Sequence, residues 1–169
     1  CFNCAGLSQA ILQWHKQEPF DAILTFCSGM IGHARLIVRY AKARGRPIPR
    51  HVMDLVDVDS AKWRNYAESS WPPMSWVYAA ESRRLRKVEA GAYDHFDAVT
   101  VVSERERQVY REQVGDHPGL CVVGNGVDLD YFVPSPQAGG HRLVFVGLLD
   151  YKPNVDGVIW FVKHVMPLV

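Results

Sequence analysis

Short apolar runs alternate with amphipathic stretches along this chain, in an order typical of a parallel α/β fold. The apolar runs predict buried strands at residues 20–26, 51–58, 97–102, 120–123 and 143–146. Apolar residues at helical spacing predict helices at residues 31–44, from residue 75 onward, directly after Ser103, and at residues 155–165. Alternation of this kind predicts parallel sheets covered by helices on both faces, which is a doubly wound α/β fold.

Local residues mark where some of these elements begin or end. Ser103 and Glu106 form an S-x-x-E capping box, which predicts a helix start at the end of the strand at 97–102. Residues 63–74 end in a proline pair, Pro72-Pro73, and are expected to be irregular.

A loop rich in Pro, Ser and Gly separates two parts of the chain. We expect residues 1–133 to form part of one Rossmann-like domain, residues 134–140 to be a linker, and residues 141–169 to be the first β-α unit of a second domain. One strand and one helix cannot bury their apolar surfaces alone, so the last helix should expose several of its valine and isoleucine side chains. These are Val155, Val158, Ile159 and Val162. The chain has no starting Met, and we expect it to be a fragment of a longer protein.

Composition narrows the class of protein. Hydrophobic residues make up 48% of the 169 residues and charged residues 22%, which is normal for a chain with a folded core. The net charge of +1 does not indicate a nucleic-acid partner. No apolar run approaches the ~20 residues that a membrane-spanning helix needs. Four cysteines are few for a disulfide scaffold and fit a reducing compartment, and the Cys1-x-x-Cys4 pair lacks the second pair that a zinc ribbon requires.

Ligands of doubly wound proteins bind at the carboxyl ends of the strands, and that rule selects four places here. They are Ser28-Gly29, the acidic cluster Asp54, Asp57 and Asp59, the helix start at Ser103, and the loop 147–154.

The loop 147–154 is the best anion site of the four. Gly147 would let a phosphate approach the backbone, a helix expected to begin near Asn154 would point free N–H groups at it, and Lys152 would add a positive charge. An ordinary turn with Asn154 as the N-cap explains the same residues equally well.

The acidic cluster also has two interpretations. Asp57-Val58-Asp59 matches the D-x-D pattern with which some glycosyltransferases hold a divalent metal. Acidic side chains that cap local N–H groups in a turn are the simpler explanation, and we expect no metal here.

Four stretches resemble glycosyltransferase family 4, closest to the sugar transferases of PEP-CTERM/exosortase-associated exopolysaccharide clusters: MDLVDVDSAKWRNYA, ESRRLRKVEAGAYDHFDAVTVVSERE, VVGNGVDLDYFVP and FVGLLDYKPNVDGVIWFVKHVMP. The resemblance implies the GT-B architecture of two Rossmann-like domains, the first partial and the second only begun in this chain. It also implies a retaining enzyme that takes a sugar from a nucleotide-diphospho-sugar and uses no cofactor.

The resemblance assigns roles to particular residues. Gly147 matches the glycine of the loop beside the donor diphosphate, with Lys152 as the nearby cation, whereas relatives often carry Arg where this chain has Leu148. Asp57 is the residue that we expect nearest the acceptor hydroxyl, as the catalytic group. Asn154 and Ser103 complete the predicted substrate-binding set.

The expected partners are a nucleotide-sugar donor and a glycan or lipid-linked acceptor, in the cytoplasm or at the inner face of the membrane. The basic run Arg83 to Lys87 could lie against anionic lipid in peripheral membrane association, although a solvated helix face is the simpler explanation. Two other functions stay open: a nucleotide-sugar 2-epimerase of the same architecture, and a degenerate, non-catalytic binding module. The fragment alone is expected to be inactive.

Overall fold

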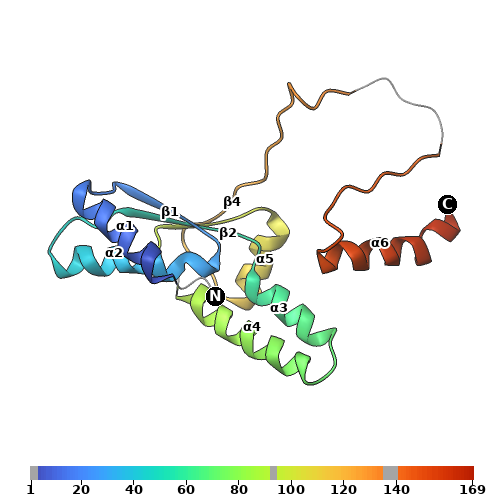
Figure 1. The fold of residues 1–169 in the computed structure, drawn as a ribbon, viewed down its shortest axis with the longest axis horizontal. Coiled ribbons are helices and arrows are strands. Elements are labelled where there is room, and N and C mark those ends of the chain that lie inside the picture. Colours follow the sequence, from blue (N-terminus) through green and yellow to red (C-terminus); the bar gives the residue numbers. More distant parts are fainter. Residues whose placement is uncertain (1–3, 92–94, 135–140) are drawn as a thin grey trace. The chain divides into compact units, whose positions relative to one another are not determined.

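We describe the protein from a computed structural model, which covers residues 4–91, 95–134 and 141–169 (Figure 1). The chain divides into two compact units, Cys1–Gly126 and Val127–Val169. The elements of the first unit are, in chain order, α1 (Ala5–Gln17), β1 (Ala22–Phe26), the 3₁₀ turn η1 (Ser28–Met30), α2 (Ile31–Ala43), β2 (Arg50–Val56), α3 (Asp59–Glu68), α4 (Met74–Ala90), β3 (Ala98–Val101), α5 (Glu104–Gln113) and β4 (Leu120–Val122).

The first unit is built on one sheet of four strands. Neighbouring strands are parallel and follow the order β1-β2-β3-β4. This confirms that the apolar runs at 20–26, 51–58 and 97–102 are parallel strands of a single sheet. The fold is therefore α/β and Rossmann-like.

Helices cover only one face of this sheet among the residues that the structure describes (Figure 1). Met53, Val99 and Val101 are fully buried beneath the helices and pack with α2 and α5 in a single core. On the other face Leu24 and Phe26 are 70% and 61% exposed. The expectation of helices on both faces is therefore not met in this part of the chain. Each connection between successive parallel strands has the same hand, and each new strand is added on the same side of the previous one. Every connecting helix therefore lies on the same face of the sheet.

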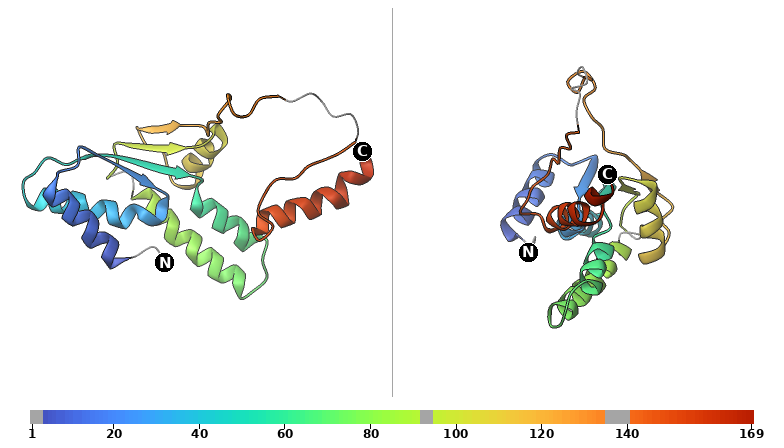
Figure 2. Two further views of the ribbon diagram at one scale, coloured as in Figure 1. Left: turned by 45° about the horizontal axis from the view of Figure 1, so that its top comes forward. Right: turned by 90° about the vertical axis from the view of Figure 1, so that its right-hand side faces the viewer.

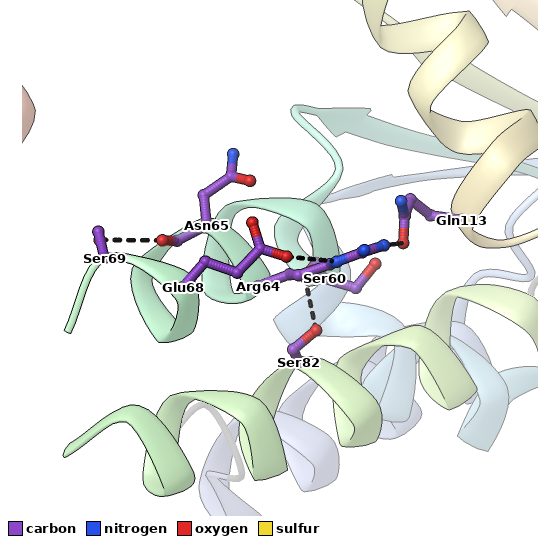
Figure 3. Close-up of polar contacts among 7 residues, drawn as sticks. All are labelled: Ser60, Arg64, Asn65, Glu68, Ser69, Ser82 and Gln113. Atoms are coloured by element: carbon purple, nitrogen blue, oxygen red, sulfur yellow. Dashed lines mark hydrogen bonds and ion pairs between the residues drawn. The ribbon is translucent and has the colours of Figure 1, made fainter. Parts of the chain in front are cut away.

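Helix α3 corrects another expectation, because residues 63–74 are helical as far as Glu68. The helix packs along α4 through the ring of Trp63, whose centroid lies 5.4 Å from that of Tyr78. At the start of α3, the Ser82 hydroxyl of α4 donates a 2.8 Å hydrogen bond to the Ser60 carbonyl (Figure 3). Packing of this kind stabilises a helix that lacks strong local signals.

A polar contact ties the same helix to α5. The Arg64 guanidinium donates to the carboxylate of Glu68 at 2.9 Å and to the amide oxygen of Gln113 at 3.2 Å (Figure 3). Helix α4 thus holds the start of α3 at Ser60, and helix α5 holds α3 one turn further along at Arg64.

Helix α1 has no counterpart among the elements predicted from the sequence. It packs on α2, where the side chains of Ser8 and His33 share a 2.8 Å hydrogen bond. His15 near its end is buried against the rings of Phe20 and Tyr40.

The second unit contains α6 (Lys152–His164) and the 3₁₀ turn η2 (Met166–Leu168). The strand predicted at 143–146 is absent from the described part of this unit, so this prediction is wrong; a strand needs a partner, and these residues have none there. None of the α6 side chains is buried, and Ile159 and Val162 are exposed, as predicted. Most of the predicted linker, residues 135–140, lies outside the described residues.

Candidate functional site

A pocket of about 770 Å³ in the first unit opens at the carboxyl ends of β1 and β2. Its polar and aromatic lining comes from Ser28 and His33 after β1, from Asp59, Lys62 and Trp63 of α3, and from Glu81 and Arg84 of α4. Two smaller pockets, of about 510 and 450 Å³, lie beside the opposite ends of the strands. In parallel α/β sheets the carboxyl edge is the ligand-binding edge, so we take the larger pocket as the candidate site.

Strained backbone marks both strand ends that border the pocket. Cys27 follows β1 with a φ of 62°, and Val56 ends β2 with a φ of 64°. Both lie in the left-handed region, which is unfavourable for residues with a side chain and especially for a β-branched valine. The Cys27 amide is held by a 2.8 Å hydrogen bond to the Asp54 carbonyl. Such strain clusters at functional sites, and Cys27 itself lines the pocket.

Asp59 is the best-held charged group in the pocket. Its carboxylate accepts a 2.5 Å hydrogen bond from the Ser28 hydroxyl and lies 3.3 Å from the Lys62 ammonium. Asp59 is also the first residue of α3, where the helix dipole favours a negative charge. The contacts with Ser28 and Lys62 fix the position of this side chain and join the β1 side of the pocket to the β2 side.

The remaining lining combines flat apolar surface with groups that form hydrogen bonds. Trp63 offers an indole, and the buried ring of His33 is positioned by Ser8 from α1. Arg84 pairs loosely with Glu81 at 3.4 Å. A largely apolar cavity with a few placed polar groups is the usual form of a small-molecule site.

Glu89, in the last turn of α4, is buried beside this pocket and contacts the start of α3. Its carboxylate accepts a 3.0 Å hydrogen bond from the Ser60 amide, and its second oxygen has no partner among the described residues. Burial raises the pKa of Glu89 to about 7, and the same cause raises the pKa of Tyr110 to about 12. Glu89 thus anchors α3 from below.

The predicted catalytic residue Asp57 does not line the pocket. It is exposed in the connection between β2 and α3, where its amide donates to the Leu55 carbonyl at 2.8 Å. Two residues further on, Asp59 does reach the cavity.

Ser103 is the N-cap residue of α5. Its hydroxyl accepts a 3.2 Å hydrogen bond from the Glu106 amide and caps α5, which confirms the predicted helix start. The Glu106 carboxylate accepts from the Val58 amide at 3.0 Å instead of returning to Ser103. The capping pair therefore also fixes the entry to α3.

The other predicted substrate-binding residues lie together in the second unit. A Cβ on Gly147 would come within 2.8 Å of the Asn154 amide nitrogen, which donates a 3.0 Å hydrogen bond to the Leu148 carbonyl. Lys152 lies 2.6 Å from Asp156. The alternative that makes Asn154 the N-cap is wrong, because α6 begins at Lys152 with Tyr151 as its N-cap.

Sequence reasoning missed Lys62, Trp63 and Arg84 as lining residues. The carboxyl-end rule had selected Ser28-Gly29 and the acidic cluster, and both reach or border the pocket. The sequence predicts an irregular segment at residues 63–74, so it places neither Trp63 nor the neighbouring Lys62 on a pocket wall. Among the described residues, no group of three or more His, Cys, Asp or Glu side chains could hold a metal ion.

A parallel α/β sheet with a pocket at its carboxyl edge is the arrangement in which Rossmann-like domains bind their ligands. Residues 3–126 match the Glycosyl transferase 4-like domain, and the chain belongs to this family. Membership implies sugar transfer by a glycosyltransferase that uses a nucleotide-sugar donor and an acceptor. Neither the curated proteins nor the solved structures contain a match. In the part of the chain that the structure describes, no helix has the length and apolar character to cross a membrane.

Proposed function

We propose that this protein is a retaining glycosyltransferase of the two-domain GT-B architecture. It transfers a sugar from a nucleotide-diphospho-sugar to a glycan or lipid-linked acceptor in exopolysaccharide biosynthesis, at the cytoplasmic face of the membrane. The observation that carries the proposal is the pocket at the carboxyl ends of β1 and β2, within a domain that belongs to this glycosyltransferase family.

In this proposal the pocket holds the acceptor sugar. The indole of Trp63 gives an apolar surface for a sugar ring, and Lys62 and Arg84 give donors for its hydroxyl oxygens. Asp59 gives an acceptor for hydroxyl protons. Two carboxylates and two cations balance in charge, which suits a neutral sugar better than a highly charged ligand.

The donor diphosphate is assigned to the second unit. The N-terminus of α6 and Lys152 would neutralise the departing diphosphate. Gly147 has no Cβ and would let the diphosphate approach the backbone. Asp57 remains the predicted catalytic group, although it does not line the pocket proposed for the acceptor sugar. Its exposed position after β2 leaves its carboxylate accessible to a ligand.

A transfer assay on the whole protein tests the acceptor assignment. Lys62→Gln and Arg84→Gln each remove a charge-assisted hydrogen bond, worth roughly 1.5–3 kcal/mol, so we expect the KM for acceptor to rise about tenfold or more. The KM for the donor should stay within about twofold. The matched control is Arg105→Gln, which removes an exposed arginine of α5 away from the pocket.

Each alternative predicts a different result. An unchanged acceptor KM in both variants would refute the pocket assignment, and inversion at the anomeric carbon would refute retention. Release of a free epimerised nucleotide-sugar without an acceptor would identify a 2-epimerase. A protein that binds nucleotide-sugars but turns over none of them would be a binding module.

A further inference from the structure

The hairpin of α3 and α4 ends in an exposed aromatic tip. The two helices project together from the covered face of the sheet, and the turn that joins them lies at their far end (Figure 2). Trp71 in this turn is 88% exposed, and Trp76 in the first turns of α4 is 69% exposed. Met74 and Val77 beside them are also exposed. Exposed apolar side chains that gather in one short segment mark an interaction surface, whereas single ones scattered over the surface are normal.

The outer face of α4 continues from this tip as a basic stripe. The stripe consists of three exposed residues on one side of the helix: Trp76, Arg83 and Lys87. They share this side because they are spaced by seven and four residues. With a rise of about 1.5 Å per residue, the stripe is roughly 16 Å long. The acidic residues of α4 do not oppose it, since Glu89 is buried and Glu81 pairs with Arg84.

We propose that the tip of the α3–α4 hairpin and the outer face of α4 form a docking surface for a bilayer that contains anionic phospholipid. Tryptophan rings prefer the interface between headgroups and acyl chains, and a Trp-ended helix with lysine and arginine along the same side lies in that interface. The cations meet the negative surface potential of an anionic leaflet. Charge complementarity favours lipid over a second copy of this chain, because two basic stripes would repel each other.

This inference extends the proposed function and rests on it for the nature of the acceptor. Arg84, Leu85 and Val88 of the same helix line the candidate acceptor pocket. Docking through α4 would therefore hold the pocket close to the lipid surface, where a lipid-linked acceptor sugar is presented. Vesicle binding needs no sugar transfer, so the two proposals can fail separately.

The test is flotation of the whole chain with vesicles of phosphatidylcholine alone or with 30 mol% phosphatidylglycerol, an amount of about one anionic lipid in three. We expect binding to the anionic vesicles that weakens as salt rises. Trp71→Ser with Trp76→Ser should weaken it roughly tenfold or more. Arg83→Gln with Lys87→Gln should weaken it about fivefold for each charge at low salt and flatten the salt dependence. All four positions are exposed, and circular dichroism checks that the variants fold.

Matched controls come from the same unit. Trp14→Ser removes a tryptophan of α1 that is 57% exposed, and Arg105→Gln removes an exposed arginine of α5. Neither should change vesicle binding. Failure of the unmodified protein to float with anionic vesicles would overturn the proposal, as would equal losses in the control variants. Light scattering could instead show that the unmodified protein binds no vesicles and is a dimer, and that the Trp71→Ser, Trp76→Ser double variant is a monomer. That result would mean that the surface joins two copies of this chain.

Discussion

Replacing Glu89 by Gln should make the protein less sensitive to rising pH. Glu89 is fully buried in the folded protein, and its pKa is about 7, compared with an ordinary value of 4.5. The leading cause is loss of solvation of the charged form, and the negative Asp59 nearby adds to it. The Ser60 amide acts in the opposite direction, because its hydrogen bond favours the carboxylate.

The sign follows from proton binding. Because the folded protein holds this proton more tightly than the unfolded chain, the stabilisation is complete below pH 4.5 and is lost as pH rises through about 7. The separation of the two pKa values corresponds to about 3 kcal/mol between the acidic and alkaline limits. Gln keeps the shape and the acceptor for the Ser60 amide but carries no charge. The variant should therefore match the parent near pH 5 and be more stable by about 2–3 kcal/mol at pH 8.

The assay is urea unfolding of both proteins at intervals from pH 5 to pH 8, with the free energy of unfolding compared at each pH. Other titrating groups, including His15, His51 and Asp97, contribute to both proteins and largely cancel in the difference. Glu68→Gln is the control, because Glu68 is an exposed glutamate of the neighbouring helix paired with Arg64. Its difference from the parent should stay within about 0.5 kcal/mol at every pH. A Glu89→Gln difference that does not change with pH would refute the reasoning.

The other predictions concern glycines, metal and nucleotide. Gly119→Ala should lower the free energy of unfolding by about 1–3 kcal/mol, because the new Cβ would lie 2.3 Å from the Asp97 carbonyl oxygen. The control is Gly32→Ala in helix α2, where nothing lies within 4 Å of the new Cβ. It should be neutral or stabilising in the same urea titration. Manganese at micromolar concentration should not shift the Tm, because Asp59 is already held by Ser28 and Lys62, and a shift abolished by Asp59→Asn would contradict this. Calorimetric titration of uridine or guanosine diphosphate into this chain should show no measurable binding, and micromolar affinity would contradict the expectation of an incomplete donor site. In a protein with the complete second domain, Lys152→Ala should weaken diphosphate binding about tenfold or more.

Local sequence alone determined the strands of the first unit and the start of α5. The apolar runs at 51–58 and 97–102 became β2 and β3, in which alternate side chains are buried against the helices. Ser103 and Glu106 marked the start of α5 because a capping hydrogen bond involves only neighbouring residues. The carboxyl-edge rule also pointed to Ser28-Gly29 and to the acidic residues, since it depends on strand order and direction and not on side-chain contacts.

Tertiary structure alone decided the pocket and the helix that forms its wall. Helix α3 exists through its packing on α4, with the Trp63 and Tyr78 rings in contact, and no local signal revealed that. Its formation carries Lys62 and Trp63 to the cavity, while Asp57 stays outside it. Residues 143–146 show the opposite case. Their apolar run predicts a strand, but they pair with no strand among the described residues. Propensity acts between neighbours in sequence, whereas pairing and burial depend on partners that only the folded chain brings together.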